Sequence, residues 1–314
     1  MEILFTFKIK ELQKVELTEK FPTVTFYFDG SSKGDKVKTA DVIVTYGGDI
    51  DLTLLERAES LKWLMVASAG VEKMPLTEIA KRDIIVTNVS GIHKTPMAES
   101  VLAHMLALVR SIPDIYKLNE TREWGRKFKS AELKGSTAII LGPGAIGSEI
   151  GRLLQAFGVH TIGCNRSGRK AESMDEIIQF DELIDKLPEG DFVISVLPST
   201  PETKGLITAE HFDAMKDTAI FMNFGRGDLT DEAVLLQVLK EGIIGHAVLD
   251  VFEVEPLPVD HGFWTLENCT ISPHVSALSG KYIERALVIF KHNLDKWLNE
   301  EVDLENVINP ETGY

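Results

Sequence analysis

Residues 138–151 constrain the fold of this chain more than any other segment. The apolar run at 138–141 is typical of a buried strand, and Gly-Pro-Gly-Ala-Ile-Gly follows it directly. Gly142 permits a tight turn, Gly144 lets the backbone approach a phosphate, and Gly147 lets the following helix pack closely on the strand. The helix start offers free N–H groups and a positive dipole end to an anion. A glycine-rich turn without a ligand is the alternative, but the flanking strand and helix favour a dinucleotide pyrophosphate. We expect it to contact Gly142, Gly144, Ala145, Ile146 and Gly147.

The loop after the next predicted strand bears on the identity of the dinucleotide. That strand ends at Asn165, Arg166 and Ser167, where a site for NAD would place an acidic residue on the ribose 2′-hydroxyl. No acid stands in this loop, and a guanidinium offers paired donors to a 2′-phosphate. An ordinary solvated basic loop is the alternative. The sequence predicts NADPH as the preferred cofactor, with NADH as a second one.

Charge and cysteine content narrow the functional class. With 33 basic and 48 acidic residues the net charge is −15, which disfavours nucleic acid and anionic membranes as partners. Cys164 and Cys269 lie in apolar runs, so we expect small buried side chains, with no disulfide and no metal site. The chain does not open with a signal-peptide pattern, and no apolar run has the length of a membrane span. We therefore expect a soluble, cytoplasmic protein.

Short apolar strands alternate with amphipathic helical stretches, and this pattern occurs twice. It is typical of parallel sheets covered by helices on both faces, and 314 residues are long for a single core. We predict strands at residues 3–7, 24–28, 41–46, 63–67 and 84–87, then at 138–141, 160–164, 192–197, 219–223, 246–250 and 269–272. Helices are predicted over residues 52–61, 76–81, 96–110 and 281–299.

These elements predict an α/β protein with two doubly wound parallel sheets. Residues 95–281 form a Rossmann dinucleotide-binding domain, and residues 1–94 with 282–314 form a smaller, flavodoxin-like substrate domain. The helix at 96–110 is apolar around most of its circumference, so it must be covered by its own domain or by a second subunit. The charged segment at 111–134 is expected to be a loop with irregular helix.

Three polar side chains follow predicted strands of the second domain. Arg226 comes after the strand at 219–223, Glu255 after the strand at 246–250, and His274 after the strand at 269–272. Ligands of such folds bind beyond the carboxyl ends of the strands. Alone, Arg226 could be a surface ion pair and Glu255 a solvated loop acid, but their shared position favours a joint site.

Several motifs in this order resemble those of the D-2-hydroxyacid dehydrogenases along nearly the whole chain. They are Ala69-Gly70-Val71, Met97-Ala98-Glu99, the glycine fingerprint, Leu197-Pro198 before Thr200 and Thr203, Asn223 to Gly227, Leu249 to Pro256 and Pro273-His274-Val275-Ser276. The loop after the second strand of the dinucleotide domain is similar to that of the NADPH-using glyoxylate and hydroxypyruvate reductases of this family.

The resemblance implies a role for each of these residues. Arg226 would bind the substrate carboxylate and polarise the 2-oxo group. His274 would give a proton to the carbonyl oxygen, and Glu255 would hold the other ring nitrogen and favour the imidazolium. The backbone of Ala69, Gly70 and Val71 would bind the substrate carboxylate from the other domain. The predicted cofactor contacts outside the glycine turn are Asn165, Arg166, Ser167, Leu197, Pro198, Thr203, Phe224, Gly225, Asp250 and Ser276.

The resemblance thus implies a homodimeric oxidoreductase that binds NADPH between its domains. It would reduce a small 2-oxo acid, such as glyoxylate or hydroxypyruvate, to the D-2-hydroxy acid. A non-enzymatic NAD(P)-sensing protein, like the corepressors that share this scaffold, is the alternative. A formate dehydrogenase is disfavoured by Glu255, and phosphoglycerate oxidation fits poorly because the first domain shows no evident basic cluster for a phosphate.

Overall fold

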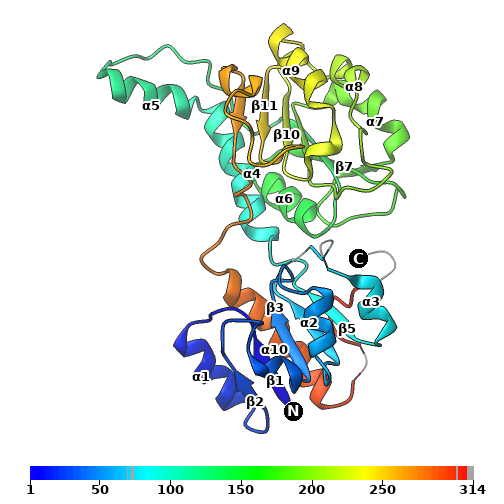
Figure 1. Cartoon of the computed structure of the whole chain (residues 1–314). Coiled ribbons are helices and arrows are strands. Elements are labelled where there is room, and N and C mark those ends of the chain that lie inside the picture. Colours follow the sequence, from blue (N-terminus) through cyan, green and yellow to red (C-terminus); the bar gives the residue numbers. More distant parts are fainter. Residues whose placement is uncertain (69, 72–73, 302, 310–314) are drawn as a thin grey trace. The chain divides into compact units, whose positions relative to one another are not determined.

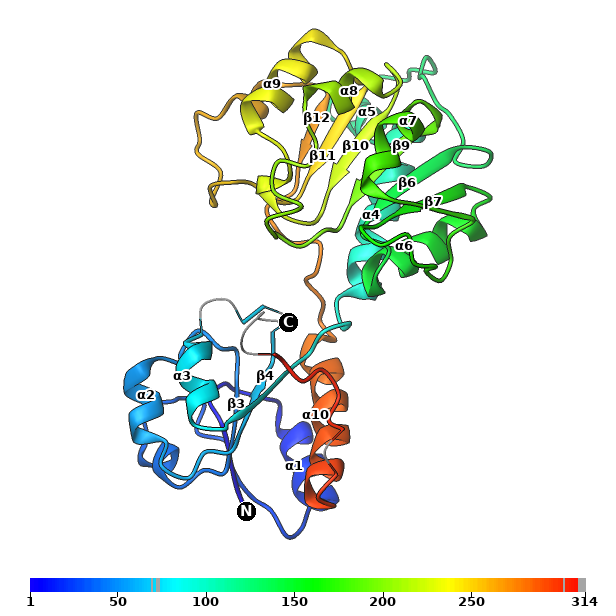
Figure 2. The same cartoon turned by 90° about the vertical axis from the view of Figure 1, so that its right-hand side faces the viewer.

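The chain consists of two compact units, which Figures 1 and 2 show in two views. The computed structural model describes residues 1–68, 70–71, 74–301 and 303–309. Unit one comprises Met1–Ile92 and Ser279–Tyr314, and unit two comprises His93–Leu278. The sequence predicts domain boundaries after residues 94 and 281, and the units of the structure divide after residues 92 and 278.

Unit one contains a five-stranded parallel sheet in the order β2-β1-β3-β4-β5. This is the flavodoxin-like order, as predicted. The strands are β1 Glu2–Phe5, β2 Thr25–Tyr27, β3 Val42–Thr45, β4 Trp63–Val66 and β5 Ile85–Asn88. The helices are α1 Glu11–Lys20, α2 Leu52–Arg57, α3 Leu76–Lys81 and α10 Tyr282–Leu298, with a 3-10 turn at Asp35–Lys38.

The helix α10 brings the end of the chain back to the first sheet, as the sequence predicts. Phe290 and Leu294 of this helix are buried in one core cluster with Phe5 and Trp63. The Trp63 ring stacks on that of Phe290 at a centroid distance of 5.8 Å. A second cluster covers the other face of the sheet, which is why β3 and β4 are buried on both faces.

Unit two contains a seven-stranded parallel sheet in the order β12-β11-β10-β9-β6-β7-β8. Figure 2 shows β6 between β9 and β7. The strands are β6 Thr137–Leu141, β7 His160–Cys164, β8 Glu176–Ile178, β9 Phe192–Ser195, β10 Ile220–Asn223, β11 His246–Leu249 and β12 Cys269–Ile271. The helices are α4 Lys94–Val109, α5 Ile112–Thr121, α6 Ala145–Ala156, α7 Leu183–Lys186, α8 Ala209–Ala214 and α9 Glu232–Glu241. Short 3-10 turns lie at Phe180–Glu182, Leu187–Glu189, Gly227–Leu229 and Gly262–Thr265.

The order of the central strands is that of the Rossmann fold, and the direction in which successive strands are added to the sheet reverses between β6 and β9. Buried residues of α6 recur at helical spacing on one face: Gly147, Ile150, Gly151 and Leu154. The Asp231 carboxylate caps α9 by accepting from the Ala233 N–H at 2.7 Å. Gly242 ends this helix in the left-handed region with φ +68°.

Two predictions about unit two need correction. A seventh strand, β8, joins the sheet at the edge beside β7, where the sequence suggested six strands. Within the segment predicted to be a loop with irregular helix, Ile112–Thr121 forms the regular helix α5. Figure 1 shows that α5 and the chain after it project from the body of unit two. None of the α5 residues is buried, so its own unit does not cover it.

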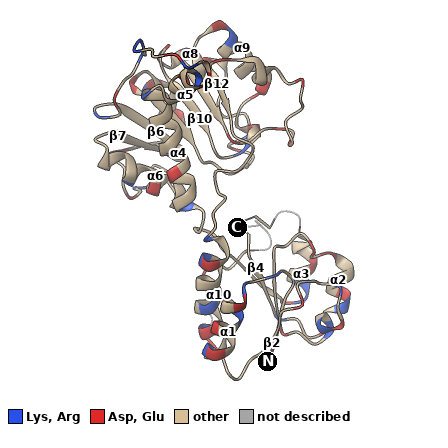
Figure 3. Ribbon diagram, turned by 90° about the vertical axis from the view of Figure 1, so that its left-hand side faces the viewer, with Lys and Arg blue, Asp and Glu red and all other residues tan. Residues whose placement is uncertain are grey.

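Both cysteines are free thiols, as expected: Cys164 is buried and Cys269 half-buried. Burial raises the pKa of each to about 12. None of the helices in the described part of the chain combines the length and apolarity needed to cross a membrane. Figure 3 shows acidic and basic residues mixed along α1, α2, α3 and α10.

His246, the first residue of β11, should make unit two sensitive to acid. Its Nε2 lies 2.9 Å from the Thr270 hydroxyl, and burial, then the charge of His104, lowers its pKa to about 4. Because this pKa lies below the unfolded value near 6.5, neutral His246 stabilises the fold fully above that pH and loses its contribution toward pH 4. Glutamine does not titrate, so the free energy of unfolding of His246→Gln should fall by about 2 to 3 kcal/mol less than that of wild type over this pH range.

Urea unfolding at neutral pH and near pH 4.5 measures this difference. His160→Gln is the matched control, since His160 also begins a strand of this sheet but is half exposed. Equal acid sensitivity of His246→Gln and wild type would contradict the prediction.

Candidate functional site

The glycine-rich turn after β6 has the geometry that a pyrophosphate needs. Gly142 has φ +90°, and a Cβ on Gly147 would lie 2.4 Å from the Gly142 carbonyl oxygen, so glycine is required at both positions. A Cβ on Gly144 would have no atom within 4 Å, which leaves open space in front of the helix. No side chain caps α6 and its first turn holds no acid. The first N–H groups of a helix lack intrahelical partners, so Ala145, Ile146 and Gly147 fit a dinucleotide pyrophosphate.

The loop after β7 is an ordered turn built around Asn165. The Asn165 Oδ1 accepts from the Ser167 N–H at 3.0 Å, and its Nδ2 donates to the Arg169 carbonyl at 2.9 Å. The side chain of Arg166 is 75% exposed, and its Nη1 lies 3.4 Å from Glu202 Oε1. Sequence reasoning did not single out Glu202. The available signal was its position in the loop after β9, the strand beside β6 in the sheet.

The loop after β9 carries Leu197, Pro198 and Thr203. Leu197 is buried, and its side chain would lie 3.1 Å from a Cβ on Gly142, so it packs on the glycine turn. The Thr203 hydroxyl donates to the Pro198 carbonyl at 2.6 Å and accepts from the Thr200 N–H at 2.8 Å. Thr203 therefore braces the loop that borders the glycine turn.

The turn after β10 holds Arg226. The buried Asn223 side chain accepts from the Gly225 N–H at 3.1 Å and donates to the Arg226 carbonyl at 2.9 Å. Asn223 thus fixes the turn through Phe224 and Gly225, a role that sequence reasoning did not assign. Arg226 lines an open cavity of about 500 Å³, whose other lining residues are Ser199, Lys204, Gly227, Asp228, Phe252 and Glu253.

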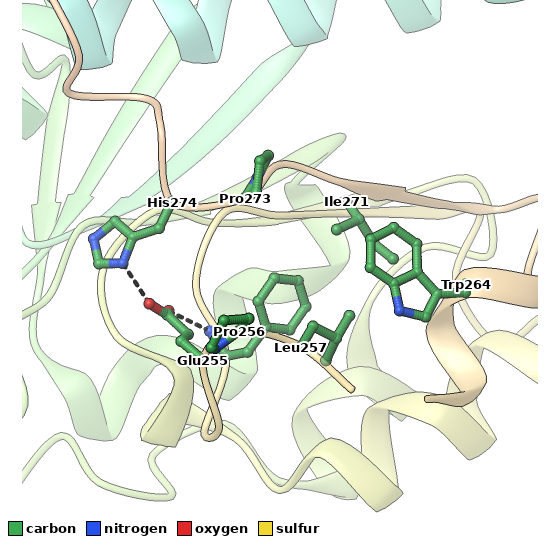
Figure 4. A pocket seen from close by; sticks show the side chains of 8 residues that line it. Glu255, Pro256, Leu257, Trp264, Ile271, Pro273 and His274 are labelled. Atoms are coloured by element: carbon green, nitrogen blue, oxygen red, sulfur yellow. Dashed lines mark hydrogen bonds and ion pairs between the residues drawn. The ribbon is translucent and has the colours of Figure 1, made fainter. Parts of the chain in front are cut away.

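His274 and Glu255 form a hydrogen-bonded pair at the carboxyl end of the sheet (Figure 4). His274 Nδ1 lies 2.8 Å from Glu255 Oε2, and Glu255 Oε1 accepts from the Phe252 N–H at 3.1 Å. With Nδ1 engaged by the carboxylate, Nε2 is the ring nitrogen available for proton exchange with a ligand. The pair borders a cavity of about 440 Å³ with a mostly apolar lining: Phe252, Pro256, Leu257, Trp264, Ile271 and Pro273.

Electrostatics keep Glu255 ionised. Burial tends to raise the pKa of this carboxyl. The hydrogen bonds from His274 and the Phe252 N–H, with the charges of His274 and Arg226, outweigh burial and lower the pKa below its usual value. The same charge of Arg226 acts on His93, whose pKa is lowered first by burial and then by the guanidinium.

A buried carboxylate holds the segment that carries His274. Asp250 is fully buried and accepts hydrogen bonds from the hydroxyls of Ser272 and Ser276, and from the Val275 N–H at 3.0 Å. His274 itself lies in the left-handed region with φ +55°, a conformation that a non-glycine residue holds only when its surroundings enforce it. Asp250 and Ser276, predicted as cofactor contacts, hydrogen-bond to each other, and their contact with a cofactor stays a prediction.

In unit one, the predicted substrate turn follows β4. Ala69 lies outside the described residues. The Ser68 hydroxyl lies 2.9 Å from the Gly70 carbonyl and 3.2 Å from the Tyr46 carbonyl, so it ties this turn to the loop after β3. Val71 is buried. Within the described part of the chain, no three His, Cys, Asp or Glu side chains are grouped so that they could hold a metal ion.

The chain is similar to known dehydrogenases and reductases. Residues 102–276 match the model of the "D-isomer specific 2-hydroxyacid dehydrogenase, NAD binding domain". The chain is 36% identical to a D-3-phosphoglycerate dehydrogenase of Methanocaldococcus jannaschii, over 88% of this chain and 53% of that protein. It is 33% identical to a glyoxylate reductase of Aeropyrum pernix, over 88% of this chain and 85% of that protein.

A solved structure extends the similarity to the whole fold. The NADPH-dependent glyoxylate/hydroxypyruvate reductase of Sinorhizobium meliloti, in complex with NADP and sulfate, superposes with a TM-score of 0.80. The two chains are 29% identical, and the match covers 100% of this chain and 99% of the other. By contrast, this chain spans about half the length of the phosphoglycerate dehydrogenases it matches.

Proposed function

Because the chain belongs to the D-isomer specific 2-hydroxyacid dehydrogenase family, we propose that it reduces a small 2-oxo acid to the D-2-hydroxy acid with NADPH. The observation that carries this proposal is the pair of His274 and Glu255, 2.8 Å apart at the carboxyl end of the sheet. Glyoxylate and hydroxypyruvate are the proposed substrates, in keeping with the names of the similar reductases.

Each side chain has a defined task in this proposal. When bound, the cofactor supplies the hydride that reduces the carbonyl carbon. His274, protonated, gives the proton on Nε2 to the carbonyl oxygen, which becomes the hydroxyl, and removes that proton in the reverse direction. Glu255 holds Nδ1 and so fixes which ring nitrogen faces the substrate. The Arg226 guanidinium binds the substrate carboxylate.

The proposed preference for NADPH rests on the loop after β7. Arg166 and Ser167 provide a guanidinium and a hydroxyl, and the loop at 165–168 contains no acid that would repel a 2′-phosphate. The similar Sinorhizobium reductase is described as NADPH-dependent and was solved with NADP. The glycine turn, Leu197, Pro198 and Thr203 would hold the rest of the cofactor.

We also propose that the protein works as a homodimer in the cytoplasm. Leu102, Leu106 and Val109 of α4 are only partly buried, and Tyr116 of the projecting α5 is 65% exposed. Such apolar surface is typical of a subunit interface. The free thiols suit a reducing compartment. Light scattering is expected to give twice the mass of the chain, and a monomer would contradict the dimer.

Glu255 should position His274 for proton transfer. Its ionised carboxylate lies 2.8 Å from Nδ1 and is itself held by the Phe252 N–H. Glutamine keeps one acceptor but carries no charge, so it holds the ring less firmly in the orientation that presents Nε2. We expect Glu255→Gln to lower kcat by about 10-fold to 10²-fold, the usual cost of losing a group that orients a functional histidine.

Steady-state kinetics at saturating NADPH check this expectation. Glu267→Gln removes an exposed acid of the same unit and should leave kcat at the wild-type value. A wild-type kcat in Glu255→Gln would show that the carboxylate does not act through His274.

The proposed reaction is tested by mixing the protein with NADPH, and then NADH, and following the absorbance of the reduced nicotinamide. The substrates run from glyoxylate and hydroxypyruvate to 2-ketoisocaproate and phenylpyruvate. We expect turnover of the small acids, with a higher kcat/KM for NADPH than for NADH. Tight NADPH binding without turnover of any 2-oxo acid would favour the NAD(P)-sensing alternative.

A further inference from the structure

Arg166 is already paired with a carboxylate from another loop. Its Nη1 lies 3.4 Å from Glu202 Oε1. Arg166 follows β7 and Glu202 follows β9, and β6 lies between these two strands in the sheet (Figure 2). The glycine turn leaves the same end of β6. The ion pair therefore connects the loops on either side of the turn proposed to hold the pyrophosphate.

The loop that carries Glu202 is well ordered. Two backbone N–H groups, of Thr203 and Lys204, donate to the Thr200 carbonyl at 3.1 and 3.0 Å. The pKa of Glu202 is lowered, first by its own backbone N–H, then by the Thr200 hydroxyl, with a further contribution from the charge of Arg166. Glu202 is therefore an anion at neutral pH, and it lies beside Arg166.

We propose that Glu202 is a specificity-determining residue for the cofactor. Its carboxylate competes with the 2′-phosphate of NADPH for the Arg166 guanidinium and so limits the preference for NADPH over NADH. This inference rests on the proposed dinucleotide site. The loop after β7, at the proposed ribose site, contains no acidic residue. Glu202, from the loop after β9, places one there.

The charges explain the direction of the effect. A 2′-phosphate must displace Glu202 from Arg166, and two anions then lie close to one guanidinium. A 2′-hydroxyl carries no charge, so NADH leaves the ion pair intact. Both side chains are more than half exposed, at 75% and 52%, so the effect is modest. Exposed ion pairs correspond to changes of about 1.4-fold to fivefold in an equilibrium constant.

The experiment measures binding by titration calorimetry with two fragments that differ only in the 2′-phosphate: adenosine 2′,5′-bisphosphate and 5′-AMP. We expect Glu202→Gln to bind the bisphosphate about twofold to fivefold more tightly and to bind 5′-AMP as the wild type does. Glu210→Gln is the matched control, because it removes the same charge from an exposed position at the start of α8. It should leave the ratio of the two affinities unchanged.

A double-mutant cycle separates competition for Arg166 from general charge repulsion. In the Arg166→Met background, Glu202→Gln should change the affinity ratio clearly less than in the wild type. An unchanged ratio in Glu202→Gln, or an equal change with and without Arg166, would overturn the inference while leaving the dinucleotide site standing. Failure of both fragments to bind the wild type would overturn the proposed site and the inference with it.

Discussion

Replacing His274 with asparagine is expected to lower kcat for 2-oxo acid reduction by about 10²-fold to 10⁴-fold, the usual range for loss of a general acid. Asparagine retains a polar side chain but has no titratable nitrogen, so the carbonyl oxygen must take its proton from water. His274 is not part of the glycine turn after β6 that is proposed to hold the cofactor. The affinity for NADPH should therefore stay within about twofold of wild type. Steady-state kinetics and a fluorescence titration with NADPH measure the two quantities.

His160→Asn provides the matched control for this variant. His160 is the first residue of β7 and so lies at the amino ends of the parallel strands, whereas His274 lies at their carboxyl ends. It pairs with Asp175 at 3.5 Å and has no part in the proposed chemistry. Near wild-type kcat in His274→Asn would remove the general-acid assignment. Loss of both kcat and NADPH binding would point to a structural effect of the substitution.

Replacing Arg226 with methionine is expected to lower kcat/KM for glyoxylate by about 10²-fold to 10⁴-fold. Two charge-assisted hydrogen bonds to the substrate carboxylate would be lost, at about 1.5 to 3 kcal/mol each before any compensation. Arg226→Lys keeps the charge but not the planar pair of donors, so it should restore only part of the activity. Michaelis–Menten kinetics of the two variants give the comparison.

Arg152→Met is the control for the arginine variants. Arg152 lies on α6, is 58% exposed and pairs with Glu149 at 2.7 Å, so its loss tests the effect of removing one surface guanidinium. If Arg226→Met kept the wild-type kcat/KM, the substrate carboxylate would have to bind elsewhere. A full rescue by lysine would show that charge alone is required.

The two sheets could be predicted because each central strand is an apolar run buried on both faces. Such runs stand out against the polar helices and turns between them, and β6, β7 and β10 lie where the sequence predicts strands. The strand β8 escaped prediction, since only one of its three residues is buried and it lies at the edge of the sheet. The helix α5 was not predicted as a regular element, although Ile112, Ile115 and Tyr116 recur at helical spacing, and none of its residues is buried within its own unit.

The candidate site divides in the same way. Glycines at 142 and 147 are dictated by a positive φ and by a close backbone contact, which leave a local signature in the sequence. The pairing of His274 with Glu255 was implied by the family resemblance, and the structure brings these side chains to 2.8 Å. Asn223 and Asp250 carry no such signature, because only the folded chain brings their partners to them. These partners are backbone groups for Asn223, and the Val275 N–H with two serine hydroxyls for Asp250.

The sequence by itself determined the class of fold, the dinucleotide turn and the residue types available for proton transfer and carboxylate binding. These features depend on local pattern: apolar runs, glycines at fixed offsets and polar residues after strands. Only the tertiary structure decided that Glu202 lies beside Arg166. That contact depends on the order of strands in the sheet, where β7 and β9 flank β6 although the two residues are 36 positions apart in the chain. The order of strands in the sheet decides which loops at its carboxyl ends are neighbours. Local sequence patterns do not encode this order, so they do not show which charged side chains pair.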